Sequence, residues 1–416
     1  MSASSVVFTR ARVFDGEAFL GGLRDVVVRD GVVEAVGEGI GAEDRFADIT
    51  ERVDVGGKTL LPGLTDLHVH MAINDAGNLS HVSDPFALGY YRSVDNMRLT
   101  LAQGITSVRD AGGTELGARV AVERGYVAGP RLRLAVSIMS QTGGHGDGHR
   151  HSGIDIPLVV PTPGRPRAIA DGPDECRKVT RELLRAGADH IKICSTGGVL
   201  SPADDPRHSQ FTVDEIRAIV EEADAQGTYV MAHAQGTAGI RNALVAGVRT
   251  IEHGIYLDDE TIQLMLDRDA WLVPTLVAPV AVVRGGEQPG STLPAAVVDK
   301  AKRVVEAHHT NVQRAYEAGV RIGFGTDTGV GPHGTNVEEL ALLAGIGMGL
   351  EEILGSATSN AGSFIGNAGY GLLRPGSVGD AVVLDTELTA TTQLADFGTF
   401  VAAVYQDGVP RFVRES

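Results

Sequence analysis

The amino-acid sequence predicts an α/β protein, a (β/α)8 TIM barrel with a small β-sandwich formed from both chain ends. Three observations lead to this fold class. Apolar, strand-like runs alternate with helical stretches through most of the chain, which is typical of parallel strands joined by helices. β-rich runs occupy both ends of the chain. Glycine accounts for 54 of the 416 residues, and several of these glycines directly follow a helical stretch. At this position the backbone often adopts a left-handed conformation, which glycine tolerates without steric strain.

The first part of the predicted β-sandwich covers residues 1–62. Its β-rich runs are short, and Asp-Gly and Gly-Gly pairs that favour tight turns separate them. Strands are expected at Val6–Phe8, Ala11–Phe14, Asp25–Arg29 and Val32–Val36. This region is therefore predicted to be a small all-β unit.

The predicted barrel covers residues 63–368. Its eight strands are short apolar runs, expected at Leu64–His70, Ile105–Arg109, Arg133–Ser137, His190–Cys194, Tyr229–His233, Thr250–His253, Trp271–Pro274 and Arg321–Gly325. Helices between most pairs of strands are expected at Asp95–Gln103, Glu115–Arg124, Glu175–Ala186, Val213–Gln226, Ile240–Ala246, Asp259–Asp267 and Ala295–Ala318. Eight such units in about 300 residues fit a (β/α)8 barrel.

Two long stretches, Ser140–Pro173 and 275–294, interrupt the alternation and are predicted to be loops. Loops at the C-terminal ends of barrel strands build active sites. After Gly369 the β character returns, with strands expected at Asp380–Asp385, Phe400–Tyr405 and Pro410–Val413. Residues 369–416 are therefore expected to complete the β-sandwich.

Composition excludes several classes of partner. Lys and Arg number 36 and Asp and Glu number 53, so the formal net charge is -17. Nucleic-acid affinity comes mainly from basic side chains that neutralise phosphates, so a nucleic-acid partner is excluded. No signal-peptide pattern is present and no apolar run approaches ~18 residues, so no membrane association is expected. The two cysteines, Cys176 and Cys194, cannot form a disulfide framework, and a cytoplasmic location is expected.

The first candidate metal ligands are His68 and His70, at the end of an apolar run. Alternation along a strand places both imidazoles on one face, with Cα atoms ~6.5 Å apart. Imidazole suits zinc and other late transition metals. The pair therefore indicates a metal site, although two histidines can also occur on a strand without a metal.

Lys192 is the second unusual residue. Strand alternation predicts that Ile191 and Ile193 face the helices and that Lys192 faces the barrel interior. A buried lysine is costly unless it is neutralised or paired. Carboxylation by CO₂ would solve this by converting the cation into an anionic bridging ligand. The alternative is a lysine at a strand end whose ammonium group reaches solvent.

Three further polar residues end or follow predicted strands: His233, His253 and Asp327. Each has a structural explanation on its own, such as Asp327 capping the next helix. Together with His68, His70 and Lys192, however, they fall at the C-terminal ends of the first, fourth, fifth, sixth and eighth predicted strands. Barrel enzymes place their chemistry at this end, so the combined pattern predicts one active site.

These residues give the chain a resemblance to the amidohydrolase superfamily in its binuclear-metal form. The resemblance covers nearly the whole chain and includes the Pro-Gly-Leu-x-Asp-x-His-x-His motif at Pro62–His70 and the late segment Gly376–Asp385. It implies two divalent metal ions, expected to be zinc. His68 and His70 would bind the more buried ion, His233 and His253 would bind the other, and carboxylated Lys192 would bridge both. Asp327 would bind the buried ion and shuttle a proton as general base and acid, while a metal-bridging hydroxide attacks the amide.

Two strings narrow the resemblance to one branch, namely QTGGHGDGH at Gln141–His149 and AHAQGTAGIRNALVAGVRTIEHG at Ala232–Gly254. They are similar to Xaa-Pro and Xaa-Arg dipeptidases, carboxypeptidase-like amidohydrolases and ochratoxin hydrolases. His145 matches the branch histidine that contacts the scissile carbonyl, where an imidazole can hydrogen-bond a tetrahedral oxyanion. Gln235 is expected to contact the substrate, but many branch members have tyrosine at this position.

The predicted function is therefore hydrolysis of an amide C–N bond in a small molecule, a dipeptide or N-acyl amino-acid conjugate, with release of a C-terminal amino acid. Two alternatives stay open. An imidazolonepropionase-like or other cyclic-amide hydrolase would use one metal and lack the bridging lysine. A non-catalytic assembly protein of the same fold would lack metal ligands. Barrels of this kind often assemble, so a homo-oligomer is also considered.

Overall fold

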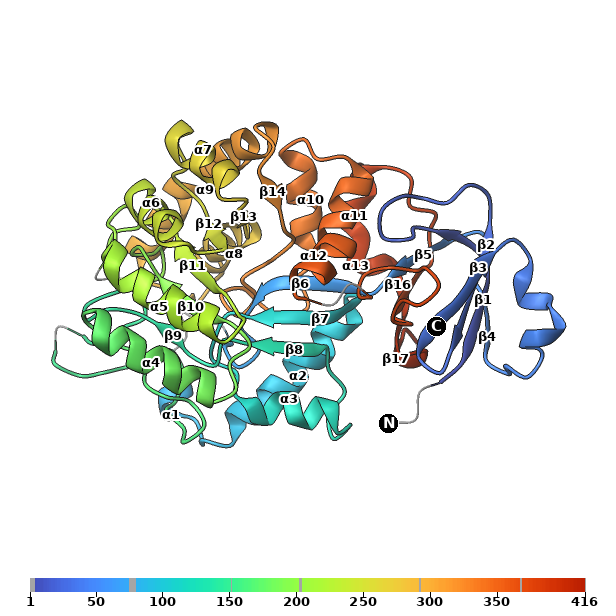
Figure 1. The fold of residues 1–416 in the computed structure, drawn as a ribbon, viewed down its shortest axis with the longest axis horizontal. Coiled ribbons are helices and arrows are strands. Elements are labelled where there is room, and N and C mark those ends of the chain that lie inside the picture. The colour runs from blue at the N-terminus through green and yellow to red at the C-terminus, as the bar shows by residue number, and fades with distance from the viewer. Residues whose placement is uncertain are drawn as a thin grey trace.

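The computed structural model describes residues 4–74, 80–150, 152–201, 204–291, 293–366 and 369–415. Within these ranges, parallel strands and most of the helices form one part of the molecule, and a sheet built from both chain ends lies beside it (Figure 1). None of the helices in these ranges is long and apolar enough to cross a membrane.

The sheet beside the parallel strands has eight strands and joins the two ends of the chain. Its order is β17-β16-β15-β5-β1-β2-β3, with β4 paired to β1. The strands are β1 (Val6–Val13), β2 (Arg24–Arg29), β3 (Val32–Gly37), β4 (Arg52–Asp54), β5 (Thr59–Pro62), β15 (Ala381–Leu384), β16 (Val401–Gln406) and β17 (Val409–Val413). Because β15 pairs antiparallel with β5, the C-terminal segment does return to the N-terminal strands.

Strand β1 shows why this sheet buries apolar side chains on both faces. Val6 and Phe8 belong to one buried cluster, whereas Val7 belongs to another. Successive side chains of a strand point to opposite faces, so a run of apolar residues supplies both clusters. The two strands predicted in this region are in fact one, with a register shift between Phe8 and Ala11 where Arg10 has a φ of 55°.

Nine further strands of the described residues pair in parallel and carry the cavity described below. One sheet contains β6 (Leu64–Val69), β7 (Ile105–Asp110) and β8 (Arg131–Leu134). The other contains β9 (Ile138–Met139), β10 (Ile191–Cys194), β11 (Val230–Ala234), β12 (Thr250–His253), β13 (Trp271–Val273) and β14 (Arg321–Ile322). Every neighbouring pair within each sheet is parallel. Parallel strands with intervening helices are typical of α/β folds of the TIM-barrel type.

The helices alternate with these strands and cover them. They are α1 (Ser80–Ser83), α2 (Leu88–Ala102), α3 (Leu116–Glu123), α4 (Pro173–Arg185), α5 (Val213–Ala225), α6 (Thr237–Ala246), α7 (Asp259–Asp267), α8 (Val277–Gly286), α9 (Ala295–Glu317), α10 (Glu338–Gly345), α11 (Leu350–Ala357), α12 (Ser359–Phe364) and α13 (Phe397–Phe400). Apolar side chains of the strands, together with those on the helix faces that pack against the strands, form the largest buried cluster. Local sequence starts some helices, as in α5, where Thr212 and Glu215 form a capping box.

Two further sequence predictions differ from the structure. The third barrel strand, predicted at Arg133–Ser137, instead ends at Leu134 as β8, and β9 begins only at Ile138, because Val136 between them has a left-handed φ of 68°. The stretch 275–294, predicted to be a loop, contains α8. Its first turn is stabilised from far along the chain, since the Glu339 carboxylate accepts hydrogen bonds from the backbone N–H groups of Leu276 and Val277 at 2.9 and 2.7 Å.

Candidate active site

The structure brings all eight side chains singled out from the sequence to one cavity at the C-terminal ends of the parallel strands. The lining includes His68, His70, His145, Lys192, His233, Gln235, His253 and Asp327. The rest of the lining is mostly apolar and comes largely from the loops after β9 and β10 and from α8. The cavity lining therefore combines a group of polar side chains with apolar ones, as small-molecule sites commonly do.

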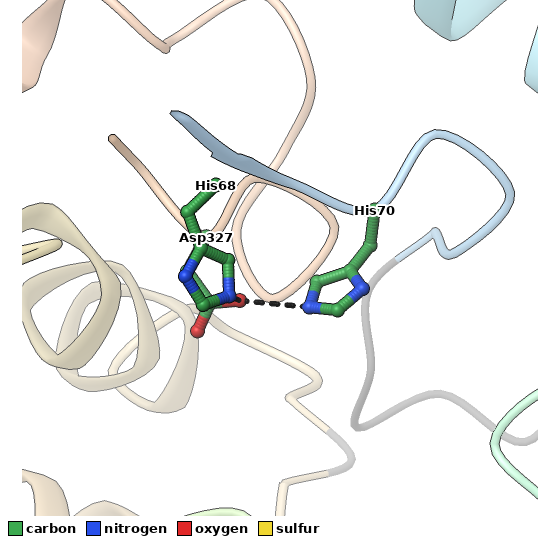
Figure 2. Close-up of side chains that lie close together, drawn as sticks. All are labelled: His68, His70 and Asp327. Atoms are coloured by element: carbon green, nitrogen blue, oxygen red, sulfur yellow. Dashed lines mark ion pairs between the residues drawn. The ribbon is translucent and has the colours of Figure 1, made fainter. Parts of the chain in front are cut away.

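Three of these residues form a compact group that can hold a metal ion. The ligand atoms of His68, His70 and Asp327 lie within 4.8 Å of one another, and all three residues are buried. Oδ1 of Asp327 is 3.3 Å from Nε2 of His68 and 3.1 Å from Nε2 of His70. Figure 2 shows the carboxylate beside the His68 ring and directed at His70. Burial opposes ionisation of Asp327, but the two histidines hold the pKa of its carboxyl well below the usual range.

Lys192 of β10 adjoins this group. Its residue is only 2% exposed, and Nζ lies 3.3 Å from Nε2 of His68. The flanking Ile191 and Ile193 belong to the largest apolar cluster, as the alternation of a strand requires. Burial lowers the pKa of Lys192, which favours the neutral amine.

His68 and His70 each have one ring nitrogen held by a protein oxygen. Nδ1 of His68 lies 2.7 Å from Oε2 of Glu252, and Nδ1 of His70 lies 2.8 Å from the carbonyl oxygen of Gly112. An imidazole that donates from Nδ1 has its lone pair on Nε2. Both Nε2 atoms belong to the compact group, so the two rings are oriented as metal-binding histidines are.

His233 and His253 are held in the same manner. Nε2 of His233 lies 3.0 Å from the carbonyl oxygen of Gly197, and Nδ1 of His253 lies 2.7 Å from Oγ1 of Thr275. Their ring centroids are 4.6 Å apart. Burial keeps the pKa of both imidazoles well below the usual value, so both are neutral, which is the form that binds metals.

The backbone is strained at two of the candidate ligands. His253 has a φ of 73° and Asp327 a φ of 58°, and such values are uncommon for residues other than glycine. The Asp327 N–H donates to the carbonyl oxygen of His68 at 2.7 Å, which ties its loop to β6. Gly325 allows this close approach, because a Cβ at that position would overlap Val273.

Sequence reasoning missed the buried pair Glu252 and Arg109. Both side chains are fully buried, and an Arg109 guanidinium nitrogen donates to both carboxylate oxygens at 2.9 and 3.0 Å. Burial opposes ionisation of Glu252, but Arg109 and His68 bring the pKa of its carboxyl to about 2. The carboxylate therefore stays charged and accepts the Nδ1 hydrogen of His68. Glu252 directly precedes His253, but no sequence pattern indicates that it orients His68.

Replacing Glu252 with glutamine is expected to weaken metal binding by about 10- to 100-fold, because the partner that orients His68 loses its charge. The substitution also leaves Arg109 without a buried counter-charge, so the melting temperature should fall. Chelator competition and thermal unfolding check the two effects. Glu260→Gln on the exposed face of α7 is the matched control. Unchanged metal affinity in Glu252→Gln would show that His68 does not depend on this carboxylate.

His145 and Gln235 line the cavity beside the four histidines and Lys192. The His145 ring stacks on the His233 ring, with centroids 4.4 Å apart and an interplanar angle of 17°. Gln235 is 6% exposed, and its Oε1 has no hydrogen-bond partner among the residues that the structure describes. Buried oxygen atoms usually accept a hydrogen bond, and a bound ligand can supply the missing donor for Oε1 of Gln235.

The donor set fits divalent metal ions of the zinc type. Zinc takes imidazole nitrogen and carboxylate oxygen ligands, and here four histidines and an ionised aspartate line one cavity. The compact group alone offers two nitrogens and one oxygen. These residues can therefore hold a metal ion.

Comparisons with known proteins agree with this geometry. The chain matches the model of the amidohydrolase family over residues 59–410. It is 32% identical over 380 residues to an ochratoxinase of Aspergillus niger, which covers 86% of this chain and 77% of that protein. A solved prolidase complexed with N-methylphosphonate-L-proline has a TM-score of 0.87 at 34% identity, covering 99% of this chain and 100% of the other. A Xaa-Pro dipeptidase with bound methionine in the active site has a TM-score of 0.88 at 29% identity, with the same coverage. This chain belongs to the amidohydrolase family and is a hydrolytic enzyme.

Proposed function

We propose that this enzyme hydrolyses the amide C–N bond of dipeptides or N-acyl amino-acid conjugates and releases a C-terminal amino acid. The observation that carries the proposal is the convergence of four histidines, one lysine and one aspartate on a single cavity. Similar proteins named prolidase, Xaa-Pro dipeptidase and ochratoxinase support the same class of substrate.

The proposal includes two divalent metal ions, which we take to be zinc. His68, His70 and Asp327 would hold one ion, and His233 and His253 would hold the other. When bound, such a pair activates water and polarises the scissile carbonyl. The neutral imidazoles of His233 and His253 and the ionised Asp327 support this assignment, because each of these groups is in its metal-binding form.

Carboxylated Lys192 would bridge the two ions. A buried ammonium group is costly, and the hydrogen-bond partner of Lys192 is the imidazole of His68 rather than a carboxylate. Addition of CO₂ to the neutral amine forms an N–C bond and releases one proton, which yields an anionic carbamate. That anion offsets positive charge in the cavity, whereas the ammonium group would add to it.

Three protein side chains would have different roles in the reaction. Asp327 takes a proton from the attacking water and returns it to the leaving nitrogen as the C–N bond breaks. His145 hydrogen-bonds the oxygen of the scissile carbonyl, where negative charge develops. Gln235 contacts the substrate through its unpartnered Oε1.

We also propose how the chain is divided into domains. We place a (β/α)8 barrel at residues 63–368 and a β-sandwich at residues 1–62 and 369–416. Support comes from two backbone hydrogen bonds that connect β6 and its C-terminal end with the segment after β14. The Leu67 N–H donates to the carbonyl oxygen of Phe324 at 2.9 Å, and the His70 N–H donates to that of Thr328 at 2.8 Å.

The free, buried cysteines support a cytoplasmic location.

A substrate screen with metal analysis tests the function. The enzyme, expressed with zinc and bicarbonate, is expected to cleave members of a library of dipeptides and N-acyl amino acids and to contain two metal ions per chain. One ion per chain together with ring opening of cyclic amides would favour the imidazolonepropionase-like alternative. A chain without bound metal and without activity would favour a non-catalytic assembly protein.

A further inference from the structure

A second carboxylate, in the loop between β10 and α5, lies against the cavity-lining residue His145. Oδ2 of Asp204 lies 3.3 Å from Nδ1 of His145, and the two side chains are 8% and 17% exposed. His145 itself lies in the long loop after β9, so the pair joins two segments that the sequence separates by 59 residues. Neither residue belongs to the metal ligands assigned above.

Contacts on several sides confine the His145 ring. One face stacks on the His233 ring. Gly198 adjoins the ring, and a Cβ at Gly198 would overlap the imidazole, so only glycine fits this position without a shift. The His145 backbone N–H donates to Oε1 of Gln210 at 2.9 Å. Among the described residues, Asp204 is the hydrogen-bond partner of the ring, and it takes Nδ1, so Nε2 is the nitrogen left for a ligand.

Asp204 is itself held firmly. Its Oδ1 accepts the Gly198 N–H at 3.2 Å. Lys300 of α9 donates from Nζ to the carbonyl oxygens of Ser201 and Asp204 at 2.7 and 2.6 Å, and to that of Gly198 at 3.4 Å. Burial opposes ionisation of Asp204, but its hydrogen bonds with His145 and Gly198 keep the pKa of the carboxyl below the usual value. An ionised carboxylate therefore faces the ring from a fixed position.

We propose that Asp204 is a positioning residue that holds His145 by its Nδ1–H and thereby presents Nε2 to the scissile group of the substrate. A carboxylate only accepts hydrogen bonds, so Nδ1 carries a hydrogen whenever the pair is formed. Without Asp204 the ring could rotate by 180° or change tautomer. The inference rests on the proposed function, because it assumes that the substrate contacts His145.

A double-mutant cycle tests the coupling of the two residues. Asp204→Ala is expected to lower kcat/KM by about 10- to 100-fold, mainly through kcat, and His145→Ala by at least as much. In the His145→Ala background, removal of Asp204 should change kcat/KM by less than about twofold, because the ring that it positions is gone. Asp205→Asn is the matched control and should retain wild-type kinetics, because the Asp205 side chain accepts hydrogen bonds from Arg207 and from no other residue that the structure describes. If Asp204→Ala fails to fold, Asp204→Asn replaces it.

¹⁵N NMR of histidine-labelled protein gives a readout that does not need turnover. The His145 resonances are assigned by their absence in His145→Ala. We expect a protonated Nδ1 in the wild type and loss of that signature in the Asp204 variant. Additive effects in the cycle, or an unchanged Nδ1–H in Asp204→Ala, would overturn the inference. If the wild type cleaves no amide, the proposed function fails, and the NMR result alone decides whether Asp204 holds Nδ1–H.

Discussion

Replacing Lys192 with alanine is expected to lower kcat by roughly 10²- to 10⁴-fold and to reduce the metal content from the proposed two ions per chain to one or fewer. Metal-ion catalysis is worth several kcal/mol, and each ~1.4 kcal/mol changes a rate tenfold. The loss should be large because Lys192 is a buried residue of the cavity lining, with Nζ 3.3 Å from Nε2 of His68. Steady-state kinetics and metal analysis by mass spectrometry check both effects.

The carbamate itself can be tested separately. Intact-protein mass spectrometry under non-denaturing conditions should find one added CO₂ per chain in the wild type. Acetate or formate added to Lys192→Ala should restore part of the activity, because a small carboxylate can occupy the vacated space. Lys178→Ala on the exposed surface of α4 is the control and should behave as wild type. A fully active, metal-loaded enzyme with unmodified Lys192 would refute the bridging role.

Changing Asp327 to asparagine is expected to lower kcat by about 10²- to 10⁴-fold while KM changes little, because general acid–base catalysis is lost and substrate contacts are kept. His68 and His70 hold the pKa of Asp327 well below its usual range. The base is therefore ionised at neutral pH, and wild-type activity should decline only as acid protonates it. The variant should lack that acidic decline. Measurements of kcat and kcat/KM between acidic and neutral pH check this.

Asp327 is also assigned as a metal ligand, so the two roles must be separated. A variant that keeps both ions but loses turnover would support proton transfer. A variant that loses metal in proportion to activity would indicate that ligation is the main role. Asp299→Asn on the exposed side of α9 serves as the control. Near-wild-type activity of Asp327→Asn would remove the aspartate from the mechanism.

Much of the candidate site can be predicted from local sequence because strand periodicity is a local property. Alternation places His68 and His70 on one face and turns Lys192 away from Ile191 and Ile193, and the structure shows all of these orientations. Because the candidate residues all lie at the C-terminal ends of predicted strands, residues that are far apart in the sequence are predicted to meet at one end of the barrel. The helices between Val213 and Asp267 are also predictable, because caps and apolar spacing lie within the segments themselves.

Other features depend on partners far along the chain. Helix α8 begins at a segment whose N–H groups are capped by Glu339, more than sixty residues later, so a local reading predicts a loop. Glu252 is an ordinary acidic residue in sequence, and only its burial against Arg109 and His68 reveals its role. Asp204 is likewise unremarkable until the fold places it beside His145.

The sequence by itself therefore determined which histidines, which lysine and which aspartate would meet in the candidate site, and the family of enzymes to which the chain belongs. These conclusions hold because ligand spacing and strand periodicity are encoded over a few residues. Only the tertiary structure decided how the four histidine rings are oriented. In each ring, an oxygen atom holds one nitrogen and thereby fixes the direction of the other nitrogen. Glu252, Gly112, Gly197 and Thr275 supply those oxygens, and no local pattern connects them to the rings that they hold.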